Sequence, residues 1–218
     1  MKTLTLFAIF LLSTTASAAP DAAAPLKPVV PAATPATPAA PSTSATPATP
    51  TAPVVVSVLG SEEVCFSPKG GCTDMIIKTI LAAKKSIYVQ AYSFTSAPIV
   101  RALIAASARK VKVSILVDKS NVSTIEPTCV GRDRTAMSLL PGTKVWYAVD
   151  KAHAIAHNKI MIMDENTVLT GSFNFSGAAE SSNAENMIRL IGAPRAKLYL
   201  DNWKVHQKHA IECHPPTN

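Results

Sequence analysis

The sequence has no apolar run long enough to cross a bilayer on its own, although a shorter one lies near its start. Leu4 to Leu12 is apolar apart from Thr5, whereas a transmembrane helix needs about 20 such residues. Lys2 precedes this run and Ala16-Ser17-Ala18 follows it, as in a secretory signal peptide with a small-residue cleavage site. We therefore expect residues 1–18 to be a signal peptide and the mature protein to be periplasmic or secreted.

Large apolar side chains are almost absent from residues 19–53, which consist mainly of proline, alanine and threonine. Such a segment cannot bury enough apolar surface to fold, and its prolines favour extended backbone. We expect a disordered linker here. Residues 54–218 remain, about the usual size of one domain.

Tight C-x-x-C pairs are also missing, although residues 54–218 contain four cysteines. An even count behind an export signal favours disulfide bonds. Three pairings are possible, and we favour Cys65–Cys72 with Cys129–Cys213. Zinc binding is the alternative, with ligands drawn from Cys65, Cys72, His153, His209 and His214, but it lacks the close cysteine spacing typical of such sites.

Acidic residues are in the minority. Removal of Lys2 with the signal peptide leaves 20 basic against 14 acidic residues, a net charge of +6. This excess falls within residues 54–218 and favours polyanionic partners, either nucleic acid or anionic lipid headgroups. The basic residues that could follow a phosphate backbone are Lys110, Lys112, Lys119, Arg132, Arg134, Lys144 and Lys151.

The apolar pattern predicts an α/β fold with a mixed, largely parallel β-sheet flanked by helices, in one domain per protomer. Strand-like runs at 54–59, 86–92 and 111–117 alternate with helical patterns at 74–84 and after Ser96, and this rhythm is typical of parallel strands. Thr73 and Ser96 are the expected helix caps.

The second half of the chain adds further predicted elements. We expect a polar loop over 121–133, a short helix over 135–140, and strands over 144–149, 158–163, 167–170 and 185–191. A final amphipathic helix should cover 193–212, with packing residues Leu198, Leu200, Trp203 and Val205. No internal repeat is apparent.

Four polar residues stand on two of these apolar segments. His157 and Lys159 are two residues apart, so they share a face of a strand, and Ser172 and Asn174 do so as well if their segment is extended. Together they offer a nitrogen nucleophile, a cation for phosphoryl oxygens, and neutral donors, a set suited to covalent chemistry on a phosphodiester.

Three neighbours of these residues receive other roles. Asp164 lies seven residues after His157, on the other parity and at the end of the strand, so we expect it to cap the turn at Glu165 or to pair with a base. Gly171 belongs to the motif structurally. His153 has no accompanying pattern, and an H-x-x-x-H zinc pair with His157 would be poorly spaced on a strand.

The segments His157-Asn158-Lys159 through Asp164 and Gly171-Ser172-Phe173-Asn174-Phe175 resemble the signature of the phospholipase D superfamily. Further segments resemble its small bacterial endonuclease branch, in which one chain carries one motif. They are Phe66-Ser67-Pro68, Tyr92-Ser93-Phe94-Thr95 and Ser182-Asn183-Ala184-Glu185-Asn186.

This resemblance implies a non-specific DNA or RNA endonuclease that works through a phosphohistidine and needs neither metal nor cofactor. Because the motif occurs once, it also implies a homodimer with the two His157 residues facing each other across a two-fold axis. Glu185 resembles the carboxylate that orients the histidine. The alternatives are a phospholipase D-type lipid phosphodiesterase or phosphatidyl transferase, and a non-enzymatic module that only binds phosphate.

Overall fold

The structure, a computed structural model of the chain, describes residues 56–58, 62–125, 129–132 and 134–213. The expected signal peptide, the linker and His214 lie outside these residues. In the described part of the chain, nine strands form one mixed sheet. Their spatial order is β1 (Val56–Val58), β2 (Glu62–Ser67), β10 (Glu185–Ile191), β9 (Thr167–Gly171), β8 (Lys159–Met163), β3 (Ser86–Ala91), β4 (Lys112–Asp118), β7 (Trp146–Asp150) and β11 (Ile211–Glu212).

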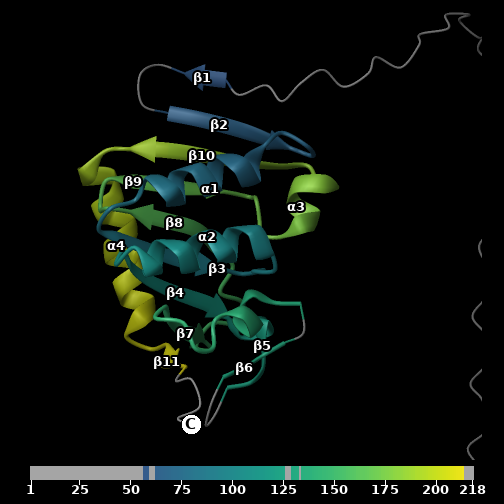
Figure 1. Cartoon of the computed structure of the whole chain (residues 1–218), viewed down its shortest axis with the longest axis vertical. Helices are drawn as coiled ribbons and strands as arrows, with labels where there is room; N and C mark the ends of the chain where they lie inside the picture. Colours follow the sequence, from purple (N-terminus) through teal and green to yellow (C-terminus); the bar gives the residue numbers. More distant parts are fainter. Residues whose placement is uncertain (1–55, 59–61, 126–128, 133, 214–218) are drawn as a thin grey trace, which may run out of the picture. The chain divides into compact units, whose positions relative to one another are not determined.

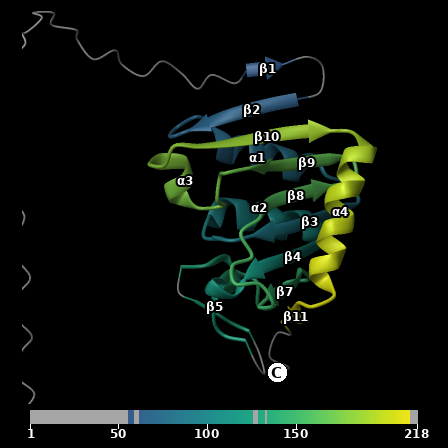
Figure 2. The same cartoon turned by 180° about the vertical axis from the view of Figure 1, so that it is seen from behind.

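Helices cover both faces of this sheet (Figures 1 and 2). On one face lie α1 (Cys72–Ala82) and α2 (Ala97–Ala108), and on the other lies α4 (Ala193–Gln207). Short elements complete the fold: η1 (Lys119–Asn121), the pair β5 (Val122–Thr124) and β6 (Val130–Gly131), η2 (Ala136–Leu139), and α3 (Gly177–Ser181). The mixed α/β sheet between helices is the fold class that the sequence predicts.

The sheet is less parallel than predicted. Only the pairs β3–β4 and β4–β7 are parallel among the described strands, and the neighbouring pairs are antiparallel. The rhythm of strands and helices is confined to the first half of the chain. In the second half, β8 and β9 are joined by a tight turn at Asp164–Glu165, with both residues at positive φ, so these strands must run in opposite directions.

Two hydrophobic cores lie on the two faces of the sheet. The larger packs α1 and α2 against the strands through residues such as Ile76, Ile99 and Leu103. The smaller packs α4 through Ala196, Leu200 and Trp203, which recur on one helical face. The indole of Trp203 also donates to the carbonyl of Val89 at 2.9 Å.

Several predicted details of the helices are wrong. Leu198 and Val205 are exposed, because α4 packs through the opposite stripe. This helix also ends at Gln207 rather than Glu212, because Ile211 and Glu212 pair with β7. The expected cap Thr73 lies inside α1, whose first amides are bound instead by Glu180 of α3, at 3.0 Å from Gly71 N and 2.7 Å from Thr73 N.

Both favoured disulfides are present, Cys65–Cys72 and Cys129–Cys213. The first joins β2 to the start of α1, and the second joins the region of β6 to the end of β11. The strand β2 is not among the strands that the sequence predicts. Within the described residues, no helix is long and apolar enough to span a membrane.

Candidate active site

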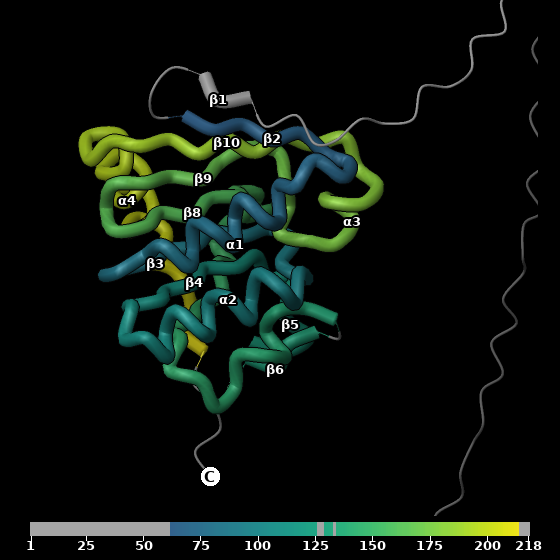
Figure 3. The backbone as a smooth tube through the Cα atoms, turned by 45° about the horizontal axis from the view of Figure 1, so that its top comes forward, coloured from purple at the N-terminus to yellow at the C-terminus, as the bar shows by residue number. Residues whose placement is uncertain are grey.

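One edge of the sheet gathers the predicted site residues. The parallel strands β3, β4 and β7 end there, and the register places the start of β8 and the end of β9 beside them: Ala91 faces Lys159, and Ile160 faces Thr170. The start of β10 joins the same edge, since Met187 faces Gly171. We call this the active edge. Figure 3 shows α3 and the β5–β6 pair on this side of the sheet.

His157 lies two residues before the start of β8, at the rim of an open hollow, and is exposed. Its ring packs against Tyr92, with ring centroids 4.5 Å apart and planes tilted by 51°. The backbone is fixed nearby, because Tyr92 N donates to the carbonyl of Asn158 at 3.0 Å. The imidazole is therefore held on one face while its other face is open to a substrate.

Lys159 is buried, with 7% of its surface exposed. Its Nζ donates to the carbonyl of His157 at 2.6 Å and lies 5.0 Å from the centre of the Tyr92 ring. Burial lowers the pKa of this ammonium, and the negative charge of Glu185 partly opposes that shift. A buried ammonium of this kind gains from an anion in the hollow, because burial disfavours an unpaired charge.

Ser172 and Asn174 face the same hollow because the residues that alternate with them, Phe173 and Phe175, point into the core. Phe173 and Phe175 are completely buried, although the segment leaves the sheet after Gly171. The hydroxyl of Ser172 accepts from Asn186 N at 3.1 Å, and Asn174 Oδ1 accepts from Ser93 N at 3.4 Å. The side-chain oxygen of Asn174 thus faces the backbone of Ser93, so the NH₂ group of Asn174 points away from that backbone.

The hollow includes residues that sequence reasoning missed. It is lined by His157, Asn158, Lys159, Ile160, Thr170, Gly171, Ser172, Asn174 and Glu185. Glu185 lies within it, but its carboxylate accepts a hydrogen bond from Asn183 at 3.1 Å rather than from His157. Sequence reasoning gave no role to Tyr92, which contacts His157 and Lys159 from outside the lining of the hollow. Only its place in a family-like segment could have indicated it.

Gly171 and Asp164 support the site from different places. A Cβ at Gly171 would lie 2.2 Å from the carbonyl oxygen of Asn186, so only glycine fits between β9 and β10. Asp164 lies at the opposite edge of the sheet. Its carboxylate accepts from the amides of Lys84, Lys85 and Ser86 at 2.7–3.0 Å, so it joins the α1–β3 connection instead of capping its own turn.

The structure also divides the predicted basic residues. Lys119, Arg132, Arg134 and Lys151 belong to the segments that follow β4 and β7 at the active edge. At the opposite edge, Lys110 and Lys144 precede β4 and β7, and Lys112 is the first residue of β4, about 20 Å away for strands of this length. The first group therefore lies on the same side of the sheet as His157.

The zinc alternative is wrong in its cysteine part, since Cys65 and Cys72 are bonded to each other. His153 and His209 nevertheless lie together, beside His206 and the buried Asp150. Burial by itself raises the pKa of Asp150, but hydrogen bonds from His206 and His153 outweigh it and lower the pKa to about 2. His153 is therefore part of a built cluster and not an isolated surface residue.

The profile of the family described as "Cardiolipin synthase, PLD-like domain" matches residues 76–204, more than half of the chain. The chain belongs to this family and thus to the phospholipase D superfamily. The match includes His157, Lys159, Ser172, Asn174 and Glu185.

Individual relatives point to one branch. The chain is 31% identical to Nuc from Salmonella typhimurium, a phospholipase D family member, with a TM-score of 0.63 over 70% of this chain and 97% of Nuc. NucT from Helicobacter pylori shares the fold, with 19% identity and a TM-score of 0.61 over 69% of this chain and 98% of NucT. The chain therefore belongs to the Nuc-like branch.

A third relative differs in its name. "Phospholipase D" of Rickettsia conorii is 44% identical over 139 residues, which make up 64% of this chain. The match spans 66% of that relative, slightly less than two thirds of its length.

Proposed function

We propose that this protein hydrolyses phosphodiester bonds of nucleic acids through a phosphohistidine on His157. The observation that carries the proposal is the pairing of an exposed imidazole with a buried ammonium, His157 and Lys159, in one open hollow. A reactive nitrogen and a desolvated cation at the same place suit a reaction in which negative charge builds on phosphoryl oxygens.

The reaction needs two steps. In the first, a ring nitrogen of His157 attacks phosphorus, an N–P bond forms, and the P–O bond to the leaving group breaks as that oxygen takes a proton from a general acid. In the second, the same acid group, now a base, takes a proton from water, the water oxygen attacks phosphorus, and the N–P bond breaks. Lys159 and the amide of Asn174 hold the non-bridging oxygens, and the hydroxyl of Ser172 adds a third polar contact.

The general acid is the second His157 of a homodimer. A single chain supplies one such motif, and the described residues contain no second histidine in the hollow. His157 is exposed at the rim, where a two-fold axis would bring its counterpart to the other side of the same phosphate. Lys159 and Asn174 then also occur twice around the substrate.

Nucleic acid is the substrate that the charge distribution favours. Lys119, Arg132 and Arg134 are exposed and flank the active edge, where they can contact successive phosphates. Both disulfides, together with the expected signal peptide, support a periplasmic or secreted location. A lipid phosphodiesterase is the second candidate, favoured by the name phospholipase D of the Rickettsia conorii relative.

Plasmid nicking tests the reaction. The purified protein, in excess EDTA and at a temperature where circular dichroism shows it folded, should convert supercoiled DNA to nicked DNA, and His157→Ala should not. Cleavage that persists in His157→Ala would overturn the mechanism. If neither protein cleaves DNA or RNA while the wild type releases headgroups from phospholipid vesicles, the lipid candidate replaces the nuclease.

Mixed dimers test the shared site. Wild-type and His157→Ala chains, co-expressed in varied ratios, form dimers of which only the wild-type pairs retain both histidines. Activity should then fall with the square of the wild-type fraction. A linear fall would show that each protomer works alone.

A further inference from the structure

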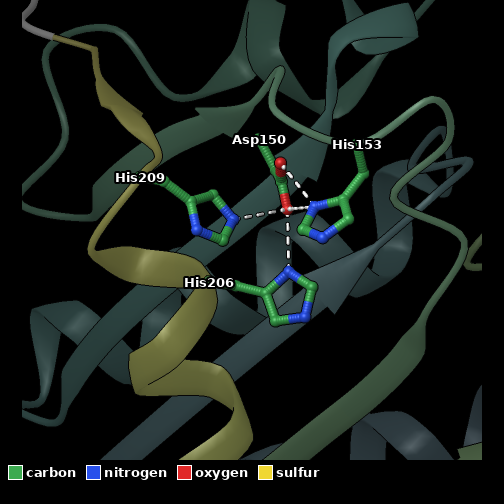
Figure 4. Close-up of side chains that lie close together, drawn as sticks. All are labelled: Asp150, His153, His206 and His209. Atoms are coloured by element: carbon green, nitrogen blue, oxygen red, sulfur yellow. Dashed lines mark hydrogen bonds and ion pairs between the residues drawn. The ribbon is translucent and has the colours of Figure 1, made fainter.

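Four side chains converge beside the active edge without belonging to the hollow (Figure 4). Asp150 is the last residue of β7, and His153 lies in the loop that follows. His206 comes from the last turn of α4, and His209 from the turn after it. One ligand atom from each residue can be chosen so that all four lie within 4.8 Å of one another.

The distances are close to those around a metal ion. Asp150 Oδ2 lies 3.0 Å from His153 Nδ1, 2.8 Å from His206 Nδ1 and 3.5 Å from His209 Nε2. A tetrahedral Zn²⁺ with bonds of about 2.0–2.1 Å keeps its ligand atoms ~3.3 Å apart. The three measured distances lie on both sides of that value, and small rotations of the rings would bring the nitrogens into place.

The cluster gathers three imidazoles around one carboxylate. A single carboxylate oxygen faces three imidazoles, whose ring centroids are 4.8–5.4 Å apart. Asp150 is 2% exposed. Its other oxygen, Oδ1, accepts from Ala152 N at 3.1 Å and also lies 3.1 Å from His153 Nδ1. Three protonated rings would repel one another at this spacing, whereas one divalent cation would bind all three through their lone pairs.

We propose that Asp150, His153, His206 and His209 form a binding site for one divalent transition-metal ion, with Zn²⁺ as the best match. Three imidazoles and one carboxylate form a nitrogen and oxygen set that suits zinc in tetrahedral geometry and selects against Mg²⁺ and Ca²⁺, which prefer oxygen ligands. Four protein ligands close the coordination sphere, so the ion has a structural role.

The ion would fasten two parts of the chain that meet at this edge. His206 and His209 belong to the end of α4, and Asp150 and His153 belong to β7 and the loop that leads to His157. That loop is also held by Asp118, whose Oδ2 accepts from Ala156 N at 2.8 Å. The metal would therefore limit the motion of the backbone four residues before the proposed nucleophile.

Metal binding can be measured without reference to activity. The protein, prepared without a polyhistidine tag and stripped with chelator, is titrated with Zn²⁺ against a chromophoric competitor. Metal content after dialysis is measured by mass spectrometry. We expect one Zn²⁺ per chain, and a higher melting temperature with Zn²⁺ than with Mg²⁺. Co²⁺ bound in its place should give the visible absorption of a tetrahedral site.

The variants separate this site from other histidines. His206→Ala and His209→Ala should each weaken Zn²⁺ binding by more than ~10-fold and abolish the zinc-dependent rise in melting temperature. His157→Ala is the matched control, because it removes a histidine only four residues from His153. This variant should bind Zn²⁺ like the wild type. Less than one tightly held Zn²⁺ per chain in the wild type would overturn the proposal, and so would unchanged binding in both ligand variants. His206→Gln provides the same test if His206→Ala fails to fold.

Discussion

The two edges of the central sheet use similar polar residues for different purposes. At the active edge, His157, Lys159 and Asn174 line an open hollow. At the opposite edge, three consecutive backbone amides, those of Lys84, Lys85 and Ser86, are bound by a single carboxylate, that of Asp164. Asp164 belongs to the same sequence motif as His157, yet the length of β8 separates them.

The residues of one sequence motif therefore need not form a single site. Strand residues advance by about 3.3 Å each, so seven positions take the chain from one edge of the sheet to the other. The histidine and the lysine are available for chemistry, whereas the aspartate stabilises the α1–β3 connection. The comparison predicts that substitutions at the two edges will affect different measurements.

The largest effect is expected for His157→Asn. Loss of the proposed nucleophile should reduce turnover by more than ~10³-fold, because no second histidine among the described residues lines the hollow. The side chain is exposed, so thermal unfolding should be nearly unchanged. Initial rates of nicking check the loss of turnover, and a melting curve on the same preparation checks the unchanged stability. A variant that unfolds easily would place His157 with the structural residues.

Asn174→Ala should have the next largest effect. Removal of one donor to the phosphoryl oxygens is expected to cost ~10²–10³ in kcat, with a smaller change in KM. The neighbouring Phe173 and Phe175 keep the segment in place. Steady-state kinetics separate the two constants, and an effect on KM alone would mean that Asn174 only binds substrate.

Asp164→Asn tests the other edge. It weakens three hydrogen bonds to a carboxylate, and we expect a loss of ~1–3 kcal/mol in the free energy of unfolding. The activity of the folded protein should stay within about twofold of the wild type, because the residue is a strand length away from His157. Denaturant unfolding and nicking rates are the measurements. A large loss of turnover at full stability would show that the two edges are coupled.

The same carboxylate has a pH signature. Burial opposes ionisation of Asp164, but the amides of Ser86, Lys84 and Lys85 outweigh it and lower its pKa below the usual value. Its contribution to stability is therefore complete above the unfolded pKa of about 3.9 and is lost as the pH falls through the lower, folded pKa. The stability difference between wild type and Asp164→Asn should shrink below about pH 4. A constant difference would mean that charge is not involved.

The smallest effect concerns surface charge. Arg132→Gln with Arg134→Gln removes two cations at the active edge, and Lys112→Gln with Lys144→Gln removes two at the opposite edge. The first pair should lower the slope of log K against log salt for DNA binding by up to ~2, and the second should leave it unchanged. Equal changes in both would indicate that DNA does not lie along the active edge.

Local sequence patterns determined much of this protein. The strands that carry the site are predicted because apolar residues recur with a period that any sheet requires, and the pairing of His157 with Lys159 follows from strand parity alone. The choice of Cys65–Cys72 and Cys129–Cys213 is confirmed, although the sequence allowed three pairings. Because Phe173 and Phe175 are buried, Ser172 and Asn174 still face one side of the chain after β9 has ended.

Other features were decided only by the tertiary structure, because they depend on contacts between residues far apart in the chain. Glu180 binds the start of α1 from more than 100 positions away, and Asp164 reaches back to Lys84. Whether neighbouring strands are parallel or antiparallel depends on which strands pair, and hydrophobic periodicity does not specify the pairing. The cluster of Asp150, His153 and His206 exists only because α4 ends beside β7, and no spacing along the chain records that proximity.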